Sequence, residues 1–216
     1  MKIVLFGATG NVGQRVAAEA LRRGHQVIGV VRDPAAVSAS DPRIVLVKGD
    51  ATQADSVAEL TQNTDAVVSA ISPRPNARGL AAPSLAQNAR AMIAGLRRSG
   101  LKRILFVGGA GSLEVAPGQA LVDQPGFPDM YRAEALEGRD ALKVWRDEAA
   151  GLAWSFLSPA AEIAPGERTG QYRTTGDQLL TDPAGKSFIT FEDYAVAVLD
   201  ELENPKHVGR RFGVAY

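Results

Sequence analysis

Three glycines near the start of the chain have a spacing that suits the binding of a phosphate. Gly7, Gly10 and Gly13 form the pattern G-x-x-G-x-x-G directly after the apolar segment Lys2–Phe6. A loop of this kind between a strand and a helix presents backbone N–H groups and the positive end of the helix dipole to an anion. Gly7 permits a tight turn, Gly10 lets the backbone approach a pyrophosphate, and Gly13 lets the helix pack close to the sheet. Because strand, loop and helix agree, the pattern predicts a dinucleotide-binding loop rather than a glycine turn without a ligand.

The end of the second apolar segment, Gln26–Val31, indicates which dinucleotide is preferred. A basic residue at this point pairs with the 2′-phosphate of NADP(H), whereas an acidic residue binds the ribose hydroxyls of NAD(H). Arg32 comes first after the apolar run and Asp33 follows it, so we expect NADP(H), with NAD(H) as the alternative. Arg32 could instead be a solvated charge that stacks on adenine without selecting between NADP(H) and NAD(H). Asp50, after the third strand, either hydrogen-bonds the adenine amine or caps the next helix.

Three further segments should meet at the same edge of the sheet, because ligands of such folds lie outside the carboxyl ends of the strands. They are Ser69–Ser72, Gly108–Leu113 and Ser158–Glu162. Small residues in the first two leave room for a flat nicotinamide ring against the backbone. The cofactor-binding residues predicted in this way are Gly7, Thr9, Gly10, Asn11, Val12, Gly13, Arg32, Asp50, Ala51, Ser69, Ala70, Ile71, Gly108, Gly109 and Pro159.

Two polar residues of these segments are candidates for contact with an acceptor. Ser112 could orient the acceptor or donate a hydrogen bond to it, and the alternative is a serine that forms a turn after a glycine run. Glu162 could bind substrate or relay a proton, and the alternative is a loop ion pair with Arg168 or Arg173.

Strands and helices must alternate along the chain to position these residues. Strands are predicted at Lys2–Phe6, Gln26–Val31, Ile44–Lys48, Asp65–Ala70, Arg103–Val107, Ala153–Leu157 and Arg211–Ala215. Helices are predicted after the glycine loop, from Thr52 to about Thr61, near 84–96 and 130–150, and behind Thr190. This alternation predicts an α/β fold, a Rossmann-type doubly wound parallel sheet with helices on both faces. Residues 159–187 would form a small irregular C-terminal region that, with 109–128, covers the acceptor site.

Local patterns add detail to this single domain, which spans residues 1–216. Thr52 with Asp55 and Thr190 with Asp193 have capping-box spacing, and Ser84 could also cap a helix. Trp145 and Trp154 fall within apolar periodic segments, and we expect both in the core.

The composition excludes several classes of function. Lysine plus arginine total 24, as do aspartate plus glutamate, so no net charge attracts nucleic acid or an anionic membrane. The chain has no cysteine, which excludes thiol chemistry and favours a cytoplasmic location. Its two histidines are far apart in sequence, and we expect no metal site. The sequence does not indicate an oligomeric state.

Several segments together resemble one branch of a known superfamily. Gly7–Gly13, Val31–Pro34, Gly49–Asp50 and Gly108–Leu113 are similar to the NmrA-like, atypical short-chain dehydrogenase/reductases, and so are Ser158–Ile163, Pro165–Gly170 and Glu192–Ala197. Within that branch the chain resembles the NADH-flavin reductases related to biliverdin reductase B, over essentially its whole length. The resemblance implies an NAD(P)-binding oxidoreductase, with flavin as a substrate rather than a tightly bound cofactor.

The main branch of that superfamily protonates a carbonyl oxygen with a Tyr-x-x-x-Lys pair. Here the residues four positions after Tyr131, Tyr172 and Tyr194 are alanine, glycine and valine, and Tyr216 is the last residue. Hydride transfer to a flavin or a quinone does not need this acid, because solvent can supply the proton. We therefore favour an NAD(P)H-dependent reductase of a planar acceptor. The alternatives are a non-catalytic NmrA-like sensor of NADP(H) and an NAD-dependent epimerase or dehydratase.

Overall fold

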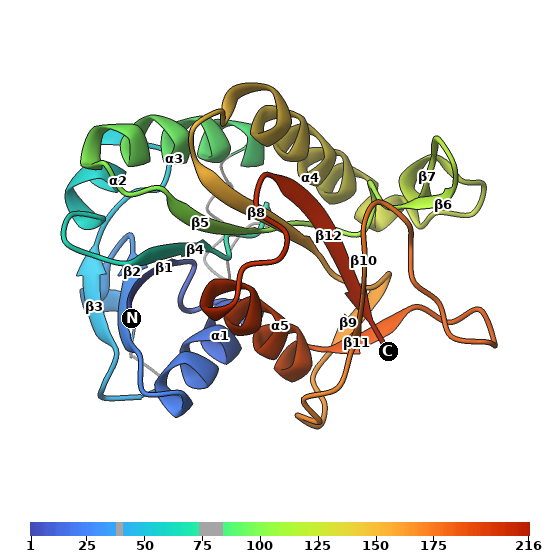
Figure 1. Cartoon of the computed structure of the whole chain (residues 1–216), viewed down its shortest axis with the longest axis horizontal. Coiled ribbons are helices and arrows are strands. Elements are labelled where there is room, and N and C mark those ends of the chain that lie inside the picture. Colours follow the sequence, from blue (N-terminus) through green and yellow to red (C-terminus); the bar gives the residue numbers. More distant parts are fainter. Residues whose placement is uncertain (38–40, 74–83) are drawn as a thin grey trace.

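An eight-stranded sheet forms the centre of the molecule (Figure 1). The structure is a computed structural model, and it describes residues 1–37, 41–73 and 84–216. The strands are β1 (Lys2–Phe6), β2 (Gln26–Val31), β3 (Val45–Lys48), β4 (Ala66–Ser69), β5 (Arg103–Val107), β8 (Ala153–Ser158), β10 (Arg173–Thr175) and β12 (Arg210–Ala215). Their order is β10-β12-β8-β5-β4-β1-β2-β3, and the pairs are parallel except β10–β12. The seven predicted strands are confirmed, with boundaries that shift by at most one residue.

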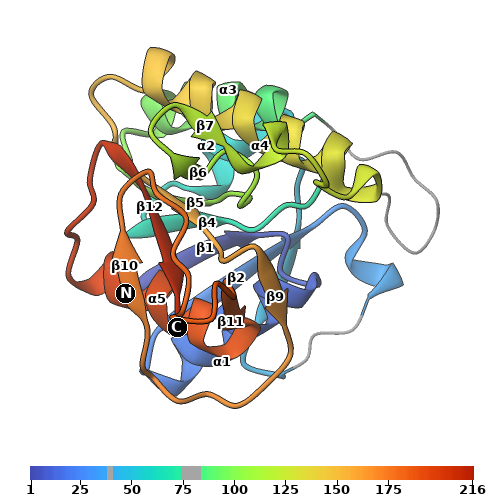
Figure 2. The ribbon, with the colours of Figure 1, turned by 90° about the vertical axis from the view of Figure 1, so that its right-hand side faces the viewer.

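Helices cover both faces of the sheet, as the alternating pattern predicts (Figure 2). One face carries α1 (Asn11–Arg22) and α5 (Phe191–Glu203), and the other carries α2 (Ala54–Leu60), α3 (Leu85–Ser99) and α4 (Asp129–Glu148). Each face has its own apolar core. Leu5, Leu157 and Phe212 lie on the α1–α5 side, whereas Phe106 and Phe156 lie on the other side with both tryptophans. Trp145 is fully buried and Trp154 nearly so, which confirms their predicted place.

Short elements occupy the two segments predicted to be irregular. Between β5 and α4 lie β6 (Glu114–Ala116), β7 (Gln119–Ala120) and the 3₁₀ turn η2 (Leu121–Asp123), and a similar turn, η1 (Pro34–Ala36), follows β2. After β8 the chain forms β9 (Glu162–Ala164), β10 and β11 (Phe188–Thr190), and β9 pairs with β11. The two segments also contact each other, because Glu114 bridges to Gln178.

The predicted helix caps have mixed outcomes. Thr190 caps α5 as expected, since its hydroxyl oxygen accepts a hydrogen bond from the Asp193 N–H at 3.1 Å. The box predicted at Thr52 is wrong: α2 begins after Gln53, which makes no side-chain cap, and the Thr52 hydroxyl donates to Asp50 instead. Ser84 stands at the N-cap of α3 without a side-chain bond. A tertiary neighbour replaces it, because the Glu137 carboxylate of α4 accepts from the Leu85 N–H at 2.9 Å.

Candidate functional site

The sheet order places the predicted site at a topological switch point. From β1 the chain runs outward through β2 and β3, then returns to β4 on the other side of β1. Loops that leave neighbouring strands in opposite directions leave a crevice at their carboxyl ends, where dinucleotides bind. The loop after β1 and the end of β4 meet there, since a Cβ on Gly7 would lie 2.4 Å from the Ala70 carbonyl oxygen. The structure thus brings together the glycine loop and Ser69–Ile71.

The three glycines are required for different physical reasons. Gly7 has φ of +81°, a left-handed conformation that favours glycine. A Cβ on Gly13 would lie 2.0 Å from the Gly7 carbonyl oxygen, so the first turn of α1 packs directly on the loop. Among the described residues, a Cβ on Gly10 would meet only that same oxygen, at 3.4 Å. The described residues therefore leave room for a side chain at Gly10, and this room fits the close approach of a ligand to the backbone.

The first turn of α1 offers donors to such a ligand. Gly10 is the N-cap, and the first helical bond runs from the Gln14 N–H to the Gly10 carbonyl at 2.9 Å. The N–H groups of residues 11–13 precede that bond and have no partner within the helix. The turn has no acidic residue, and Thr9, Gly10 and Asn11 are exposed. This geometry fits a pyrophosphate held by backbone N–H groups at the positive end of a helix.

Arg32 and Asp33 follow β2 at the same edge and differ in their surroundings. The Asp33 carboxylate accepts from the Ala35 N–H at 3.2 Å and so caps η1. Arg32 is exposed, and within the described ranges 1–37, 41–73 and 84–216 it forms no hydrogen bond or ion pair. A guanidinium without a protein partner can form a charge-assisted pair with a phosphate.

Asp50 does not cap α2, which was one of its two predicted roles, because Gln53 is the N-cap of that helix; the Asp50 side chain forms a turn ahead of it. Its Oδ1 accepts from the Thr52 N–H at 2.8 Å and from the Thr52 hydroxyl at 2.7 Å. The Asp50 N–H in turn donates to the Ser56 hydroxyl at 3.0 Å. The side chain thus shapes the turn into α2, and its contact with adenine stays a prediction. Ala51 beside it is buried.

The end of β5 is built from glycines that let α4 approach. A Cβ on Gly108 would lie 1.9 Å from the Phe156 ring, and one on Gly111 would lie 2.5 Å from the Ala135 Cβ. Gly138 of α4 faces Gly109, with 3.5 Å from its ideal Cβ to the Gly109 nitrogen. Among the described residues, a Cβ on Gly109 itself would meet nothing within 4 Å. The arrangement fits the flat ring that the sequence predicts here.

Ser112 lies in an ion-pair network on the α4 side of the sheet. Its hydroxyl oxygen accepts from the Arg211 guanidinium at 3.2 Å. Arg211 also pairs with Asp177, which accepts from Arg146 of α4 at 2.7 Å. Ser112 is in the turn closed by the Leu113 N–H and the Ala110 carbonyl, in accord with the turn-forming alternative. Its contact with an acceptor stays a prediction.

Glu162, in the segment after β8, forms neither of the two ion pairs predicted for it. Glu162 is exposed and lies 3.7 Å from the Lys186 ammonium group, so the pairing with Arg168 or Arg173 is wrong. Arg168 reaches α1, and Arg173 donates to the carbonyls of Thr181 and Tyr216. Sequence proximity suggested the first two partners, whereas the β9–β11 pairing brings Lys186 close. Pro159 is buried, and its role in binding the cofactor stays a prediction.

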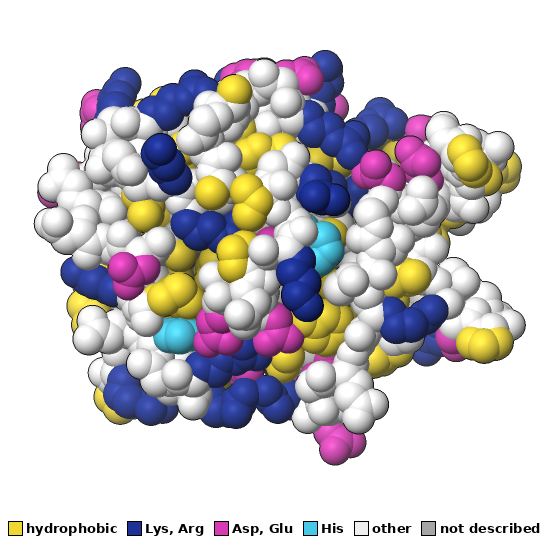
Figure 3. Space-filling view, viewed as in Figure 1, with side chains coloured by type: hydrophobic (Ala, Val, Ile, Leu, Met, Phe, Trp, Pro, Cys, Tyr) yellow, Lys and Arg dark blue, Asp and Glu magenta, His cyan; other side chains and the backbone are white. Residues whose placement is uncertain are grey.

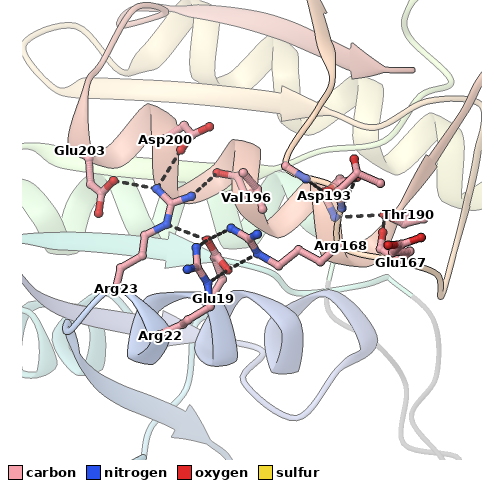
Figure 4. A network of polar contacts seen from close by, with 12 residues as sticks. Glu19, Arg22, Arg23, Glu167, Arg168, Thr190, Asp193, Val196, Asp200 and Glu203 are labelled. Atoms are coloured by element: carbon pink, nitrogen blue, oxygen red, sulfur yellow. Dashed lines mark hydrogen bonds and ion pairs between the residues drawn. The ribbon is translucent and has the colours of Figure 1, made fainter.

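A network of three arginines around Glu19 fixes the C-terminal region to α1 (Figure 4). The Glu19 side chain is only 4% exposed and accepts hydrogen bonds from Arg22, Arg23 and Arg168 at 2.7–3.0 Å. Arg23 also donates to Asp200 and Glu203 of α5. Burial raises the pKa of Glu19, but the hydrogen bonds from the arginines outweigh it and hold that pKa well below its usual range. The sequence carries no signal for this network, since its members are far apart along the chain.

These features define a class of protein: a Rossmann-type domain with an open phosphate loop at the switch point of its sheet. The model of a family described as NAD(P)H-binding matches residues 7–205. The chain belongs to this NAD(P)H-binding family. It has an α/β fold, and its family is one of reductase-like proteins that bind a nicotinamide dinucleotide.

Solved structures agree in fold and differ in name. A "putative exported protein" from Burkholderia pseudomallei is 44% identical, with both chains covered in full and a TM-score of 0.88. A "putative epimerase" from Bacteroides thetaiotaomicron is 39% identical, over 100% of this chain and 96% of that one, with a TM-score of 0.87. A "putative NADH-flavin reductase" from Streptococcus pneumoniae is 30% identical, over 100% and 99%, with a TM-score of 0.82.

Neither a membrane-spanning helix nor a cluster of metal-ligating side chains is present in the described residues. In the part of the chain that the structure describes, no helix is both long and apolar enough to cross a membrane. The same residues contain no group of three or more histidine, aspartate or glutamate side chains arranged to hold a metal ion. Acidic and basic side chains are interspersed over the face that Figure 3 shows.

Proposed function

We propose that the protein transfers hydride from NADPH to a flavin or a related planar acceptor such as a quinone. The observation that carries the proposal is an exposed phosphate loop together with a Gly109 whose added Cβ would meet none of the described residues within 4 Å, at the same edge of one sheet. The phosphate loop fits a pyrophosphate. The space beside Gly109 would accept the flat nicotinamide ring, with the ring of the acceptor beside it. The family and the Streptococcus pneumoniae structure support this proposal.

The chain's own residues would bind and orient the reactants. The N–H groups of residues 11–13 would hold the pyrophosphate, and Arg32 would pair with the 2′-phosphate. The backbone of Ser69–Ile71 and of Gly108–Gly109 would accept the nicotinamide ring. When bound, the dinucleotide supplies the hydride, and the protein contributes proximity and orientation.

A planar acceptor fits the side chains better than an alcohol or a ketone does. No tyrosine in the sequence has a lysine four residues later. The hydroxyl of Tyr172 is bound to Asp200, that of Tyr194 to the Leu157 carbonyl and that of Tyr216 to Asp193. A flavin needs no acid from the protein at the reacting atom, and Glu162 or Ser112 would at most relay a proton or orient the acceptor.

Two other functions use the same dinucleotide site. A sensor of NADP(H) would bind the dinucleotide without turnover, and an epimerase would retain NAD through its cycle. The name of the Bacteroides thetaiotaomicron structure favours the second. We rank the reductase first because a sugar-nucleotide site needs more C-terminal structure than the short strands after β8 supply. We also propose a cytoplasmic location, as the absence of cysteine suggests.

The test is NADPH oxidation with riboflavin, FMN or FAD as acceptor, repeated with NADH. We expect turnover that requires both protein and flavin, with a preference for NADPH. Arg32→Ala should raise the KM for NADPH about 10- to 100-fold, the loss expected for a charge-assisted pair, and leave that for NADH nearly unchanged. Arg210→Ala, an exposed arginine at the start of β12, serves as the control. Tight NADPH binding without turnover would refute the reductase in favour of the sensor.

A further inference from the structure

The side chain of Asn88, at the end of the first turn of α3, is fully buried and lacks hydrogen bonds. Within residues 1–37, 41–73 and 84–216, neither its Oδ1 nor its Nδ2 has a hydrogen-bond partner. Buried amides nearly always have partners, because removing an amide from water without replacing its hydrogen bonds costs stability. The Asn88 amide therefore points to a partner that comes from outside the described chain.

The place of Asn88 follows from the packing of α3 against α2, which lies beside it (Figure 1). A Cβ on Gly95 would lie 2.6 Å from the Val57 Cβ and 2.7 Å from the Ala54 carbonyl oxygen. Asn88 is seven residues earlier, so it lies on the same face of α3, about 10 Å nearer the helix start. Both helices begin at the carboxyl edge, because each leads from the end of one parallel strand to the start of the next. Asn88 thus lies past the start of α2, toward the turn that precedes this helix.

Apolar residues share this end of the α2–α3 side with the amide. Ala51, in the turn before α2, and Leu85, at the start of α3, belong to one buried core, and Ile71 after β4 packs against it. Ala51 and Ile71 are also among the residues predicted to bind the cofactor. A ligand that suits this setting is flat and largely apolar, and it carries a hydrogen-bond donor and an acceptor side by side for the Asn88 amide.

We propose that the Asn88 carboxamide binds the edge of the adenine base of the dinucleotide. Adenine presents its amine next to a ring nitrogen, the pattern of donor and acceptor that an asparagine side chain complements. Asp50, the residue predicted for this contact, has its Oδ1 engaged by the N–H and the hydroxyl of Thr52. The inference rests on the dinucleotide site of the proposed function and is independent of the acceptor. Asn88 would recognise the part that NADPH and NADH share, whereas Arg32 would recognise the 2′-phosphate.

The test replaces the amide with an apolar group of similar size and measures binding rather than turnover. Asn88→Leu should weaken the binding of NADPH and NADH alike, by about 5- to 100-fold in a titration of nicotinamide fluorescence, the range expected for loss of a bidentate contact with a base. Without nucleotide, the variant should melt at or above the wild-type Tm, because the buried amide has no hydrogen bond to lose. Gln87→Leu, which removes an exposed amide from the same turn, is the matched control and should bind like wild type.

Two competitors of NADPH show which part of the dinucleotide the amide contacts. ADP and inorganic pyrophosphate should both compete for the phosphate loop, but only ADP carries adenine. Asn88→Leu should weaken ADP by the same factor as NADPH and leave pyrophosphate unchanged, which also shows that the loop is folded in the variant. Equal losses for the two competitors would refute the contact with adenine.

The outcomes separate this inference from the proposed function. If Asn88→Leu binds NADPH and NADH as tightly as wild type, the inference falls and the reductase proposal stands. If the variant loses affinity as expected but the wild-type protein reduces no flavin, the reductase proposal falls and the contact with adenine stands. If only NADPH binds more weakly, the amide does not recognise the part that the two dinucleotides share, and the inference is refuted. Absence of dinucleotide binding by the wild-type protein overturns both.

Discussion

Replacing Glu19 tests whether its arginine network holds the C-terminal region onto α1. Glu19→Gln keeps the shape of the side chain but removes the charge, and it leaves Arg168 without a carboxylate partner. Removing one partner of a fully buried ion pair costs about 3–5 kcal/mol. Arg22 and Arg168 are 54% and 37% exposed and can be hydrated, so we expect a loss in the free energy of unfolding of about 2–3 kcal/mol. For a domain of this size, that lowers Tm by roughly 5–10 °C.

The pH dependence of this effect has a definite sign. The folded-state pKa of Glu19 lies below its ordinary value, near 4.3 in an unfolded chain. The stabilisation is therefore fully present above about pH 5 and is lost as the pH falls toward the folded-state pKa. The gap between wild type and Glu19→Gln should shrink by about 1.4 kcal/mol for each pH unit below 4.

Denaturant unfolding at pH 7 and at pH 3 measures both quantities. Glu148→Gln is the control, since Glu148 and its partner Arg90 are both about half exposed and such a pair contributes under about 1 kcal/mol. A loss for Glu19→Gln no larger than that of the control would refute the assigned role. A gap of the same size at pH 3 and pH 7 would refute the electrostatic origin.

Further predictions concern the glycine loop and a second buried carboxylate. Gly13→Ala should destabilise the fold by about 1–3 kcal/mol, because its Cβ would overlap the Gly7 carbonyl oxygen; a circular-dichroism melt that matches wild type would contradict this. Gly10→Ala should melt like wild type yet bind NADPH at least about 10-fold more weakly in a fluorescence titration, since only the ligand needs that space. Glu201→Ala removes the carboxylate beside buried Arg103 and should cost about 3–5 kcal/mol in denaturant unfolding; a cost under 1 kcal/mol would exclude the ion pair as a stabilising feature.

The sequence predicts the local elements of this fold. Ile3–Phe6 and Ile104–Val107 are apolar throughout, as is typical of strands buried on both faces, and both lie in central strands. The G-x-x-G-x-x-G loop predicts its own turn, because the left-handed backbone at Gly7 depends on residues adjacent in the chain. Such features need only neighbours along the chain, so periodicity and spacing suffice to locate them.

The sequence does not predict which residues that are distant along the chain form hydrogen bonds or ion pairs with each other. Asp193 shows the limit, since its spacing from Thr190 indicates a capping box. Its carboxylate instead accepts from the Thr169 and Tyr216 hydroxyls at 2.6 and 2.7 Å. In the same way, Glu162 faces Lys186 because β9 pairs with β11. Which groups meet across such pairings depends on the packing of whole elements, and no local pattern encodes it.

The sequence by itself determined the class of fold, the glycine loop after the first strand and the edge of the sheet where we propose that a dinucleotide binds. It did so because strand and helix periodicity, glycine conformation and the carboxyl-end rule depend on short stretches of chain. Only the tertiary structure decided that Arg32 lacks a partner in the described residues and that Ser112 contacts Arg211. The Ser112 contact depends on the place of β12 in the sheet, which is set by the packing of side chains from the whole molecule.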